Sequence, residues 1–522
     1  ARPQGRLVIL AMDGIDPDWL DTWTNEGRLP GFARLRERGT YHWLRTTQPP
    51  SCEAAWTAFV TGLAPADSGV FGPLRRDPAT RLPAPGAVDV DLAAIPPRIS
   101  SRRSGTAFWR LLDDAGVRAR VLWAPYEMSL EPLAVGEVLA GAGVPDISGR
   151  ESYLMLGAAF PDAPGEAAGL ERGRLVPSAD GWTADLPGPP SPRKGAGRLN
   201  ASLVFRRHAD GERLAMAIGD GPATAAAGAW SGRVPVRFAG GGVEAGGLAR
   251  FLALDAGPSP VVLIPPLEID PARPWLQVSY PPSYVVDLAV RYGRVPTTGS
   301  PGLSGALSAG WIAENAFLAD LLEDFDARSR VILAEFGRGG FDLFIAFVPT
   351  AGPLTRGLYR QADPSAPGHD PAAAASTAPG FGGVRLRDAV LAGYAFIDDL
   401  VGRLAGLSAP GDELIILSNH GFQPYRRAVH LNAWLRREGF LVVRRDAGAD
   451  AARRPPGPAD VDWTRTRAYA VGHGAIYANL AGREPGGIVE PDERLEMFLA
   501  RLAERLDAWR DAGAGGARVV RR

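Results

Sequence analysis

The chain has 522 residues, 46% of them hydrophobic, so it can bury one large core or two ordinary ones and is expected to be globular. Its 57 Lys and Arg residues against 58 Asp and Glu residues give a formal net charge of -1, which offers no global attraction to nucleic acid. The single cysteine, Cys52, excludes an intrachain disulfide and a multi-cysteine metal cluster.

Apolar stretches are too short for a membrane span. None approaches the ~20 apolar residues that a transmembrane helix requires, so no transmembrane segment is expected and the chain is predicted to be soluble. A protein without disulfides is compatible with both the cytoplasm and the periplasm, and the sequence leaves these two compartments open.

The first predicted strand is the apolar run of residues 6–12. It ends in Asp13-Gly14, as a buried parallel strand and its exit turn do. Helical patterns follow at residues 18–25 and 30–38.

The next segment, residues 51–62, has the pattern of a helix capped by Ser51 and stopped by Gly62. Cys52 is therefore expected at a helix N-terminus, where the helix dipole would favour its thiolate.

Strands and helices then alternate along the chain. We predict helices at 108–115 and 386–407 and strands at 119–123, 343–348 and 413–417. This alternation is typical of a doubly wound α/β fold, in which a mainly parallel sheet carries helices on both faces. The last of these strands delivers Asn419-His420-Gly421 at its carboxyl end.

The middle of the chain has a different residue pattern. Short alternating runs between glycine-rich turns predict a β-rich insertion over about 197–274, and the Pro- and Gly-rich residues 161–196 are interpreted as a surface connection. The predicted domains are an α/β core formed by 1–160 and 275–522, and an inserted part over 161–274.

Three polar features fall at the carboxyl ends of the predicted strands. In open parallel sheets ligands bind there, so Asp13, Cys52 and the Asn419-His420 pair are candidate site residues. Each has an ordinary alternative: the aspartate as a turn former, the cysteine as a small buried hydrophobe, and Asn-His-Gly as a turn. Their shared location is what favours a site.

Residues 7–18, 29–39, 46–62, 418–422 and 430–435 resemble the type I phosphodiesterase and nucleotide-pyrophosphatase branch of the alkaline-phosphatase superfamily. Shorter likenesses are present at 230–238, 270–274 and 482–491. The resemblance implies an alkaline-phosphatase-like α/β fold. It also implies hydrolysis of phosphate esters by a Ser or Thr nucleophile assisted by two zinc-like metals.

The resemblance is incomplete at the residues that carry this chemistry. Asp13 and His420 match metal ligands of the family, whereas Asn419 replaces an aspartate ligand and Cys52 replaces the nucleophile. A formylglycine made from Cys52, as in the related sulfatases, is disfavoured because Ala54 and Trp56 replace the Pro and Arg of the sulfatase motif.

The second metal site of the family aligns with residues that cannot hold a metal. Gly352 and Arg356 stand where an Asp and a His are expected. Glycine has no ligand atom and a guanidinium does not bind cations. The remaining family ligand, a histidine late in the chain, aligns with His473, which has the alternative of being a loop histidine.

Three interpretations follow from these residues. Asp13, Cys52 and His420, with Asn419 as a weaker ligand, could hold one zinc. Alternatively, Cys52 could act as a nucleophile while Arg356 replaces a metal in binding the phosphate. In the third interpretation the pocket is vestigial.

Our preferred prediction is a degenerate phosphodiesterase-like protein without two-metal hydrolysis, a pseudoenzyme that acts as a binding or scaffold subunit with either one zinc or none. It would have a protein partner or a phosphate-ester ligand and no nucleic-acid partner. The alternative is an active hydrolase of phosphate or related esters that uses Cys52.

Overall fold

The chain forms two compact units in this computed structural model. The first comprises Ala1–Phe71 and Ala87–Arg426, and the second comprises Gly72–Gly86 and Arg427–Arg522. The residues that the structure describes are 5–128, 130–149, 152–158, 169–193, 195, 197–218, 221–299, 303–424, 427–445, 456–472 and 474–520.

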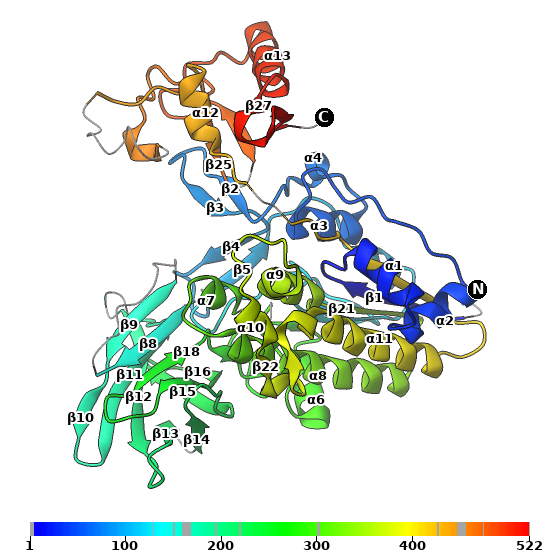
Figure 1. Ribbon diagram of the computed structural model, residues 1–522, viewed down its shortest axis with the longest axis vertical. Helices are drawn as coiled ribbons and strands as arrows, with labels where there is room; N and C mark the ends of the chain where they lie inside the picture. The colour runs from blue at the N-terminus through cyan, green and yellow to red at the C-terminus, as the bar shows by residue number, and fades with distance from the viewer. Residues whose placement is uncertain are drawn as a thin grey trace. The chain divides into compact units, whose positions relative to one another are not determined.

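A six-stranded sheet forms the centre of the first unit (Figure 1). Its neighbouring strands are all parallel except for the antiparallel pair at one edge, β20–β7. In spatial order the strands are β20 (Ser279–Tyr280), β7 (Glu137–Ala140), β6 (Ala119–Ala124), β21 (Leu343–Val348), β1 (Leu7–Met12) and β24 (Glu413–Ser418). The predicted mixed α/β architecture with a mostly parallel sheet is therefore confirmed.

The register of three strands brings their carboxyl ends to one edge. Met12 of β1 lies opposite Val348 of β21 and Ser418 of β24. The residues that follow these strands consequently emerge side by side, which is the geometry expected of a ligand site in a parallel sheet.

Helices follow the strands in the first unit. The helices near the site are α1 (Pro17–Asn25), α2 (Pro30–Arg38), α3 (Cys52–Thr61), α5 (Phe108–Asp114), α9 (Ala351–Ala362) and α11 (Ala389–Leu407). The predicted cap of α3 is confirmed, because the Ser51 side chain accepts a hydrogen bond from the Ala54 amide at 3.1 Å. Gly62 ends this helix in the left-handed conformation, with φ 71°.

The longest described helix, α8 (Glu314–Arg338), has no simple apolar stripe. It buries charged side chains as well as hydrophobic ones, among them Asp320, Asp324 and Arg328. These charges are paired, as in the 2.7 Å contact between Arg328 Nε and Asp324 Oδ2. Because buried charged pairs interrupt the apolar face of the helix, hydrophobic periodicity does not predict it.

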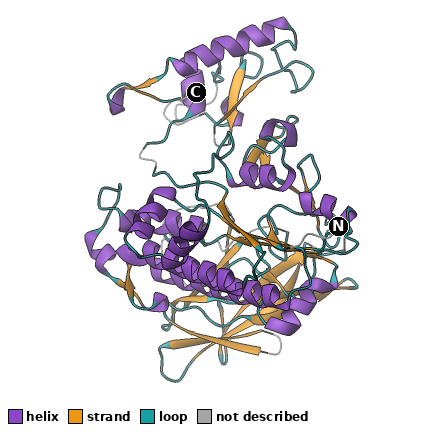
Figure 2. Ribbon diagram, turned by 90° about the vertical axis from the view of Figure 1, so that its right-hand side faces the viewer, coloured by secondary structure: helices purple, strands orange, loops and turns teal. Residues whose placement is uncertain are grey.

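A β-rich region lies between β7 and β20 in the sequence. Its described residues form strands and no helix, and Figure 2 shows strands in orange. It contains a five-stranded, a four-stranded and a three-stranded sheet. The strands are β8 (Tyr153–Gly157), β9 (Leu170–Arg174), β10 (Val176–Ser178), β11 (Gly181–Pro190), β12 (Arg198–Arg207), β13 (Arg213–Ile218), β14 (Gly221–Ala226), β15 (Val234–Gly240), β16 (Val243–Ala249), β17 (Leu252–Asp255), β18 (Val261–Ile264) and β19 (Glu268–Ile269).

Two details of this region differ from the sequence prediction. Strands β9, β10 and β11 occupy part of residues 161–196, which the sequence marked as a surface connection, because backbone pairing tolerates the prolines of β11 at a bulge. Residues 248–254, one of the short alternating runs from which the sequence predicts the insertion, are divided between β16 and β17 instead of forming one strand.

The second unit packs around its own core. A hairpin of β2 (Leu74–Arg76) and β3 (Pro83–Pro85) joins β25 (Ala468–Val471), β26 (Ala475–Ala478), α12 (Leu431–Arg437) and α13 (Glu493–Asp507) in this unit. Its buried residues include Trp434, Leu435, Phe440 and Tyr469. None of the described helices in either unit is long and apolar enough to cross a membrane.

Candidate functional site

Three loops meet at the carboxyl edge of the central sheet. Asp13 follows β1, Cys52 begins α3, and His420 follows β24. Sequence analysis placed these residues at strand and helix ends, and the structure brings all three together.

The three side chains contact one another directly. Cys52 Sγ lies 3.2 Å from Asp13 Oδ1 and 3.0 Å from His420 Nε2. The third distance, from His420 Nε2 to Asp13 Oδ1, is 3.2 Å. Both Asp13 and His420 are mostly buried, with 13% and 16% of their side chains exposed.

A backbone contact orients the imidazole of His420. Its Nδ1 lies 2.7 Å from the carbonyl oxygen of Gly421, so Nδ1 carries a hydrogen and donates it. The other nitrogen, Nε2, is thereby directed at Cys52 and Asp13. A backbone acceptor of this kind is the usual partner of a histidine that binds a metal.

Asn419 holds the loop rather than offering an oxygen to the cluster. Its Oδ1 accepts hydrogen bonds from the backbone amides of Gly14 and His420 at 3.3 and 3.0 Å, and its Nδ2 donates to Asp13 Oδ1 at 3.2 Å. If the side-chain amide were reversed, its NH₂ group would face the backbone N–H groups of Gly14 and His420, which are also donors. This geometry therefore gives Asn419 a positioning role, and its role as a metal ligand stays a prediction.

The electrostatics of the cluster favour a charged Asp13–His420 pair. Burial alone would raise the pKa of Asp13, but the hydrogen bond and charge of His420 and the charge of Arg356 outweigh it and lower that pKa. Burial would likewise lower the pKa of His420, and the hydrogen bond and charge of Asp13 raise it. Each partner thus stabilises the charged form of the other.

The structure corrects the expectation that the helix N-terminus favours a Cys52 thiolate. Burial raises the pKa of Cys52, and the negative charges of Asp13 and Glu53 raise it further. The dipole of α3 is too weak to reverse these effects. With only protein groups around it, Cys52 is a thiol that donates its hydrogen to Asp13.

Among the described residues, α9 brings no metal-ligand atom to the side of the site next to β21. Gly352 and Arg356 lie one turn apart on α9 and so share a helix face. A Cβ added to Gly352 would lie 2.8 Å from Asp13 Oδ2 and 3.1 Å from Arg356 Nη1. The guanidinium of Arg356 therefore occupies the space next to the free oxygen of Asp13.

Arg356 has a cationic group available for a ligand. Within the described part of the chain, its guanidinium forms no hydrogen bond or ion pair. Its charge acts on Asp13 and Cys52, lowering the pKa of both groups.

One metal fits the residues present, and a second does not. The ligand atoms of Asp13, Cys52 and His420 all lie within 4.8 Å of one another, and carboxylate, thiolate and imidazole are all zinc ligands. A metal on the other side would meet a glycine and a guanidinium. His473, the last candidate ligand, lies outside the described residues.

Sequence analysis missed two residues that border the cluster. Tyr126 donates a hydrogen bond to Glu53 Oε1 at 3.1 Å, and it has an unusual positive φ of 55°. Thr46 donates from Oγ1 to the backbone oxygen of Asn419 at 2.9 Å. Neither residue belongs to a charged motif, so only the polar neighbours Glu53 and Asn419 could have pointed to them.

Comparison with known proteins identifies a family for this chain. The chain matches the family described as type I phosphodiesterase / nucleotide pyrophosphatase over residues 7–134 and 368–511, which together are more than half of its length. Searches of curated proteins and of solved structures found no match. The matched segments contain Asp13, Cys52 and His420 but not Gly352 or Arg356, whose correspondence to family ligands stays a prediction. The chain belongs to the type I phosphodiesterase / nucleotide pyrophosphatase family, a branch of the alkaline-phosphatase superfamily.

Proposed function

We propose that this protein binds a phosphate ester or a related anion without two-metal hydrolysis, and that it serves as a binding or scaffold subunit. The ligand would contact Arg356 and His420, beside Asp13 and Cys52. Membership of a phosphodiesterase family supports a phosphate-ester ligand.

The observation that carries this proposal is the contact between α9 and Asp13. Gly352 supplies no ligand atom, and Arg356 fills the adjoining space with a cation. Two unit charges of the same sign at ~4 Å repel each other by about 4 kcal/mol at an effective dielectric constant of 20. A second divalent ion would face twice that repulsion and would have fewer ligands than it needs.

The residues present are suited to holding an anion. Arg356 offers a planar array of N–H donors, which suits phosphate oxygens. His420, held by Gly421 and charged by Asp13, adds a second positive group. A single zinc, if bound, would be held by Asp13, Cys52 and His420 and would supply Lewis-acid character at the same place.

The alternative is a hydrolase in which Cys52 attacks phosphorus. Its support is the 3.0 Å distance between Cys52 Sγ and His420 Nε2, which is within reach for proton transfer. Asp13 opposes this chemistry in two ways. It raises the pKa of the thiol, which disfavours the thiolate, and it raises the pKa of His420, which favours the protonated imidazole over the neutral form that accepts a proton.

The deciding experiment is metal content and turnover of the same purified protein. After loading with zinc we expect at most one equivalent of metal by elemental analysis and no hydrolysis of an aryl phosphate diester above background. Cys52→Ala and Cys52→Ser variants serve as matched controls. Two equivalents of zinc, or turnover that Cys52→Ala abolishes, would overturn the proposal.

A scaffold role also requires a surface for a partner. Trp43 and Leu44, after α2, are 63% and 69% exposed, and Phe71 is 51% exposed. Exposed apolar side chains of this size are typical of interaction sites when they cluster. Their presence supports the partner part of the proposal.

The fold contributes to the proposal as well. We propose a doubly wound arrangement, with helices on both faces of the sheet in 1–160 and 275–522, and an insertion over 161–274. The insertion is supported by a separate core cluster, whose buried residues run from Ile147 to Leu267.

A further inference from the structure

A cavity of about 240 Å³ lies next to the site in the first unit. Pro353 and Arg356 of α9 form part of its wall, and Pro353 directly follows Gly352, which touches Asp13. The cavity therefore begins where the candidate anion site ends. Its volume is below the ~300–1,000 Å³ of typical ligand pockets, so it suits a small group.

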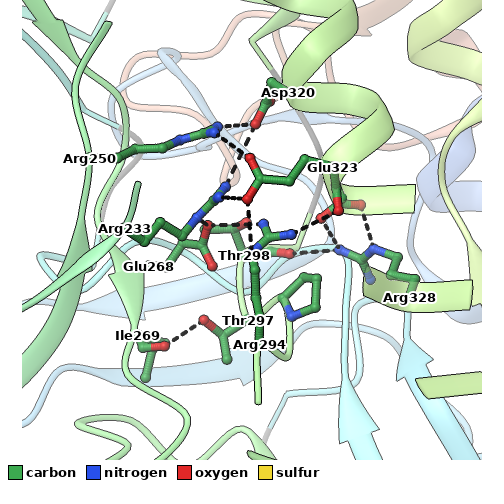
Figure 3. A network of polar contacts seen from close by, with 12 residues as sticks. Arg233, Arg250, Glu268, Ile269, Arg294, Thr297, Thr298, Asp320, Glu323 and Arg328 are labelled. Carbon is green, nitrogen blue, oxygen red and sulfur yellow. Dashed lines mark hydrogen bonds and ion pairs between the residues drawn. The ribbon is translucent and has the colours of Figure 1, made fainter. Parts of the chain in front are cut away.

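Charged side chains from two parts of the fold line this cavity (Figure 3). Arg233, Arg250 and Glu268 come from the β-rich region, Asp320 comes from α8, and Arg294 comes from the loop that precedes α7. Asp324 of α8 lines the cavity as well. The network also includes Glu323, which contacts Arg250 at 3.1 Å.

These charges already neutralise one another. Arg233 Nε lies 2.5 Å from Glu268 Oε1, and Arg250 forms an ion pair with Asp320. Burial would raise the pKa of Glu268, but the charges of Arg233, Arg294 and Arg250 lower it to about 2. A charged ligand group would compete with these ion pairs. An apolar group would displace water from the polar side chains of the wall and give them no hydrogen bond in return.

Among the described wall residues, two buried atoms have no hydrogen-bond partner, although one of them, Arg294 Nε, lies 3.8 Å from Glu323 Oε1. One is an acceptor, Glu268 Oε2, and the other is a donor, Arg294 Nε. Glu268 itself is only 7% exposed. Buried polar atoms are rarely left unpaired, so an acceptor and a donor without partners point to an absent polar group. A hydroxyl group can both donate and accept, and hence suits both.

We propose that the cavity receives a small, neutral, polyhydroxylated alcohol group of a phosphate ester whose phosphate lies at Arg356. This inference rests on the proposed function and names the class of ligand for it. An alkyl group as long as this alcohol group can neither donate nor accept a hydrogen bond, so it would leave Glu268 Oε2 and Arg294 Nε without hydrogen-bond partners.

The test compares three probes by calorimetry on the intact protein: glycerol phosphate, n-propyl phosphate and inorganic phosphate. The two esters have alcohol parts of similar size and differ in hydroxyl groups. We expect glycerol phosphate to bind about tenfold tighter than propyl phosphate or more, which is the effect of one hydrogen bond to a charged group.

A variant locates the effect in the cavity. Ser304 lines it, whereas Ser308, on the same short helix α7 (Ser304–Ser308), is exposed and does not. Ser304→Phe should reduce the affinity for glycerol phosphate to that for inorganic phosphate, and Ser308→Phe should leave it unchanged.

The outcomes separate the two proposals. Equal affinities for glycerol and propyl phosphate in the unmodified protein overturn the cavity assignment, and so does a Ser304→Phe variant that keeps the preference. In both cases inorganic phosphate still binds and the anion site stands. If inorganic phosphate does not bind at all, the proposed function is wrong and the cavity assignment fails with it.

Discussion

The two sides of the candidate site differ in what they retain. The side formed by β1, α3 and β24 brings a carboxylate, a thiol and an imidazole within 4.8 Å of one another. The side formed by β21 and α9 brings a glycine and an arginine to the same carboxylate. Both sides keep the same backbone framework of parallel strands in register.

This contrast teaches that neighbouring strand ends of one sheet can present groups of opposite chemical character. One side presents three side chains of metal-ligand type, and the other presents the guanidinium of Arg356. A single aspartate, Asp13, serves both, because Oδ1 contacts Cys52 and His420 while Oδ2 faces α9.

The largest effect is expected from Asp13→Asn, which tests the side with ligand atoms. Removing even an outer partner of a metal ligand reduces affinity by 10–100-fold, so losing a carboxylate ligand should weaken zinc binding by more than ~100-fold. A competition titration with a chelating dye measures this. Asp18→Asn, at an exposed aspartate of α1, is the control, and an unchanged Asp13→Asn affinity would show that zinc binds elsewhere.

Arg356→Gln tests the opposite side. A hydrogen bond to a charged group contributes about 1.5–3 kcal/mol, so phosphate affinity should fall by roughly ten- to a hundredfold. Zinc affinity should stay the same or rise, because a positive charge is removed. Arg360→Gln on the same helix, where Arg360 pairs with Glu314, should change neither. An equal loss of phosphate affinity in Arg356→Gln and Arg360→Gln would show that the effect comes from the net charge and not from a contact with Arg356.

Gly393→Ala tests how α9 is held. A Cβ on Gly393 of α11 would lie 2.1 Å from Leu354 Cδ2, in the buried contact between the two helices. Overpacking of this kind costs about 1–3 kcal/mol, partly offset by the higher helix propensity of alanine. Urea denaturation should show a lower free energy of unfolding. Gly406→Ala, in the same helix with open space around it, should be neutral or stabilising.

The smallest effect concerns the far end of β1 and β24, where Arg6 pairs with Asp412. The hydrogen bond with Arg6 lowers the pKa of Asp412 to about 2. The resulting stability is present above about pH 4 and is lost as the pH falls towards 2. Because Arg6 is 28% exposed, we expect about 1 kcal/mol. Unfolding free energies of wild type and Asp412→Asn should converge at low pH, and a constant gap would contradict this.

The central strands were predictable because they are continuous apolar runs. Residues 343–348 match β21, and helix 30–38 matches α2, where Pro30 marks the start. The predicted helix at 386 begins three residues later, at Ala389, after a short 3₁₀ turn. Helix ends of this kind depend on local hydrogen bonds that periodicity does not reveal.

The site was predictable only in part. Asp13, Cys52 and His420 could be placed because each follows a strong local signal at a strand or helix end. The protonation of Cys52 could not, because it depends on burial and on the charge of Asp13. The cavity could not be predicted either, since Glu268 and Asp320 are far apart in the sequence and both contact Arg233 only in the folded chain.

The second unit is built from two pieces of chain that are far apart in the sequence and are therefore synthesised at different times. Arg76 of the hairpin pairs with Glu484 at 2.9 Å, and Arg81 donates to Asn479 at 3.1 Å. About 340 residues separate the two pieces in sequence. At roughly 5–20 residues per second, the hairpin leaves the ribosome tens of seconds before its partners exist. This unit can therefore be completed only after residues 427–522 have been translated, when most of the first unit has emerged.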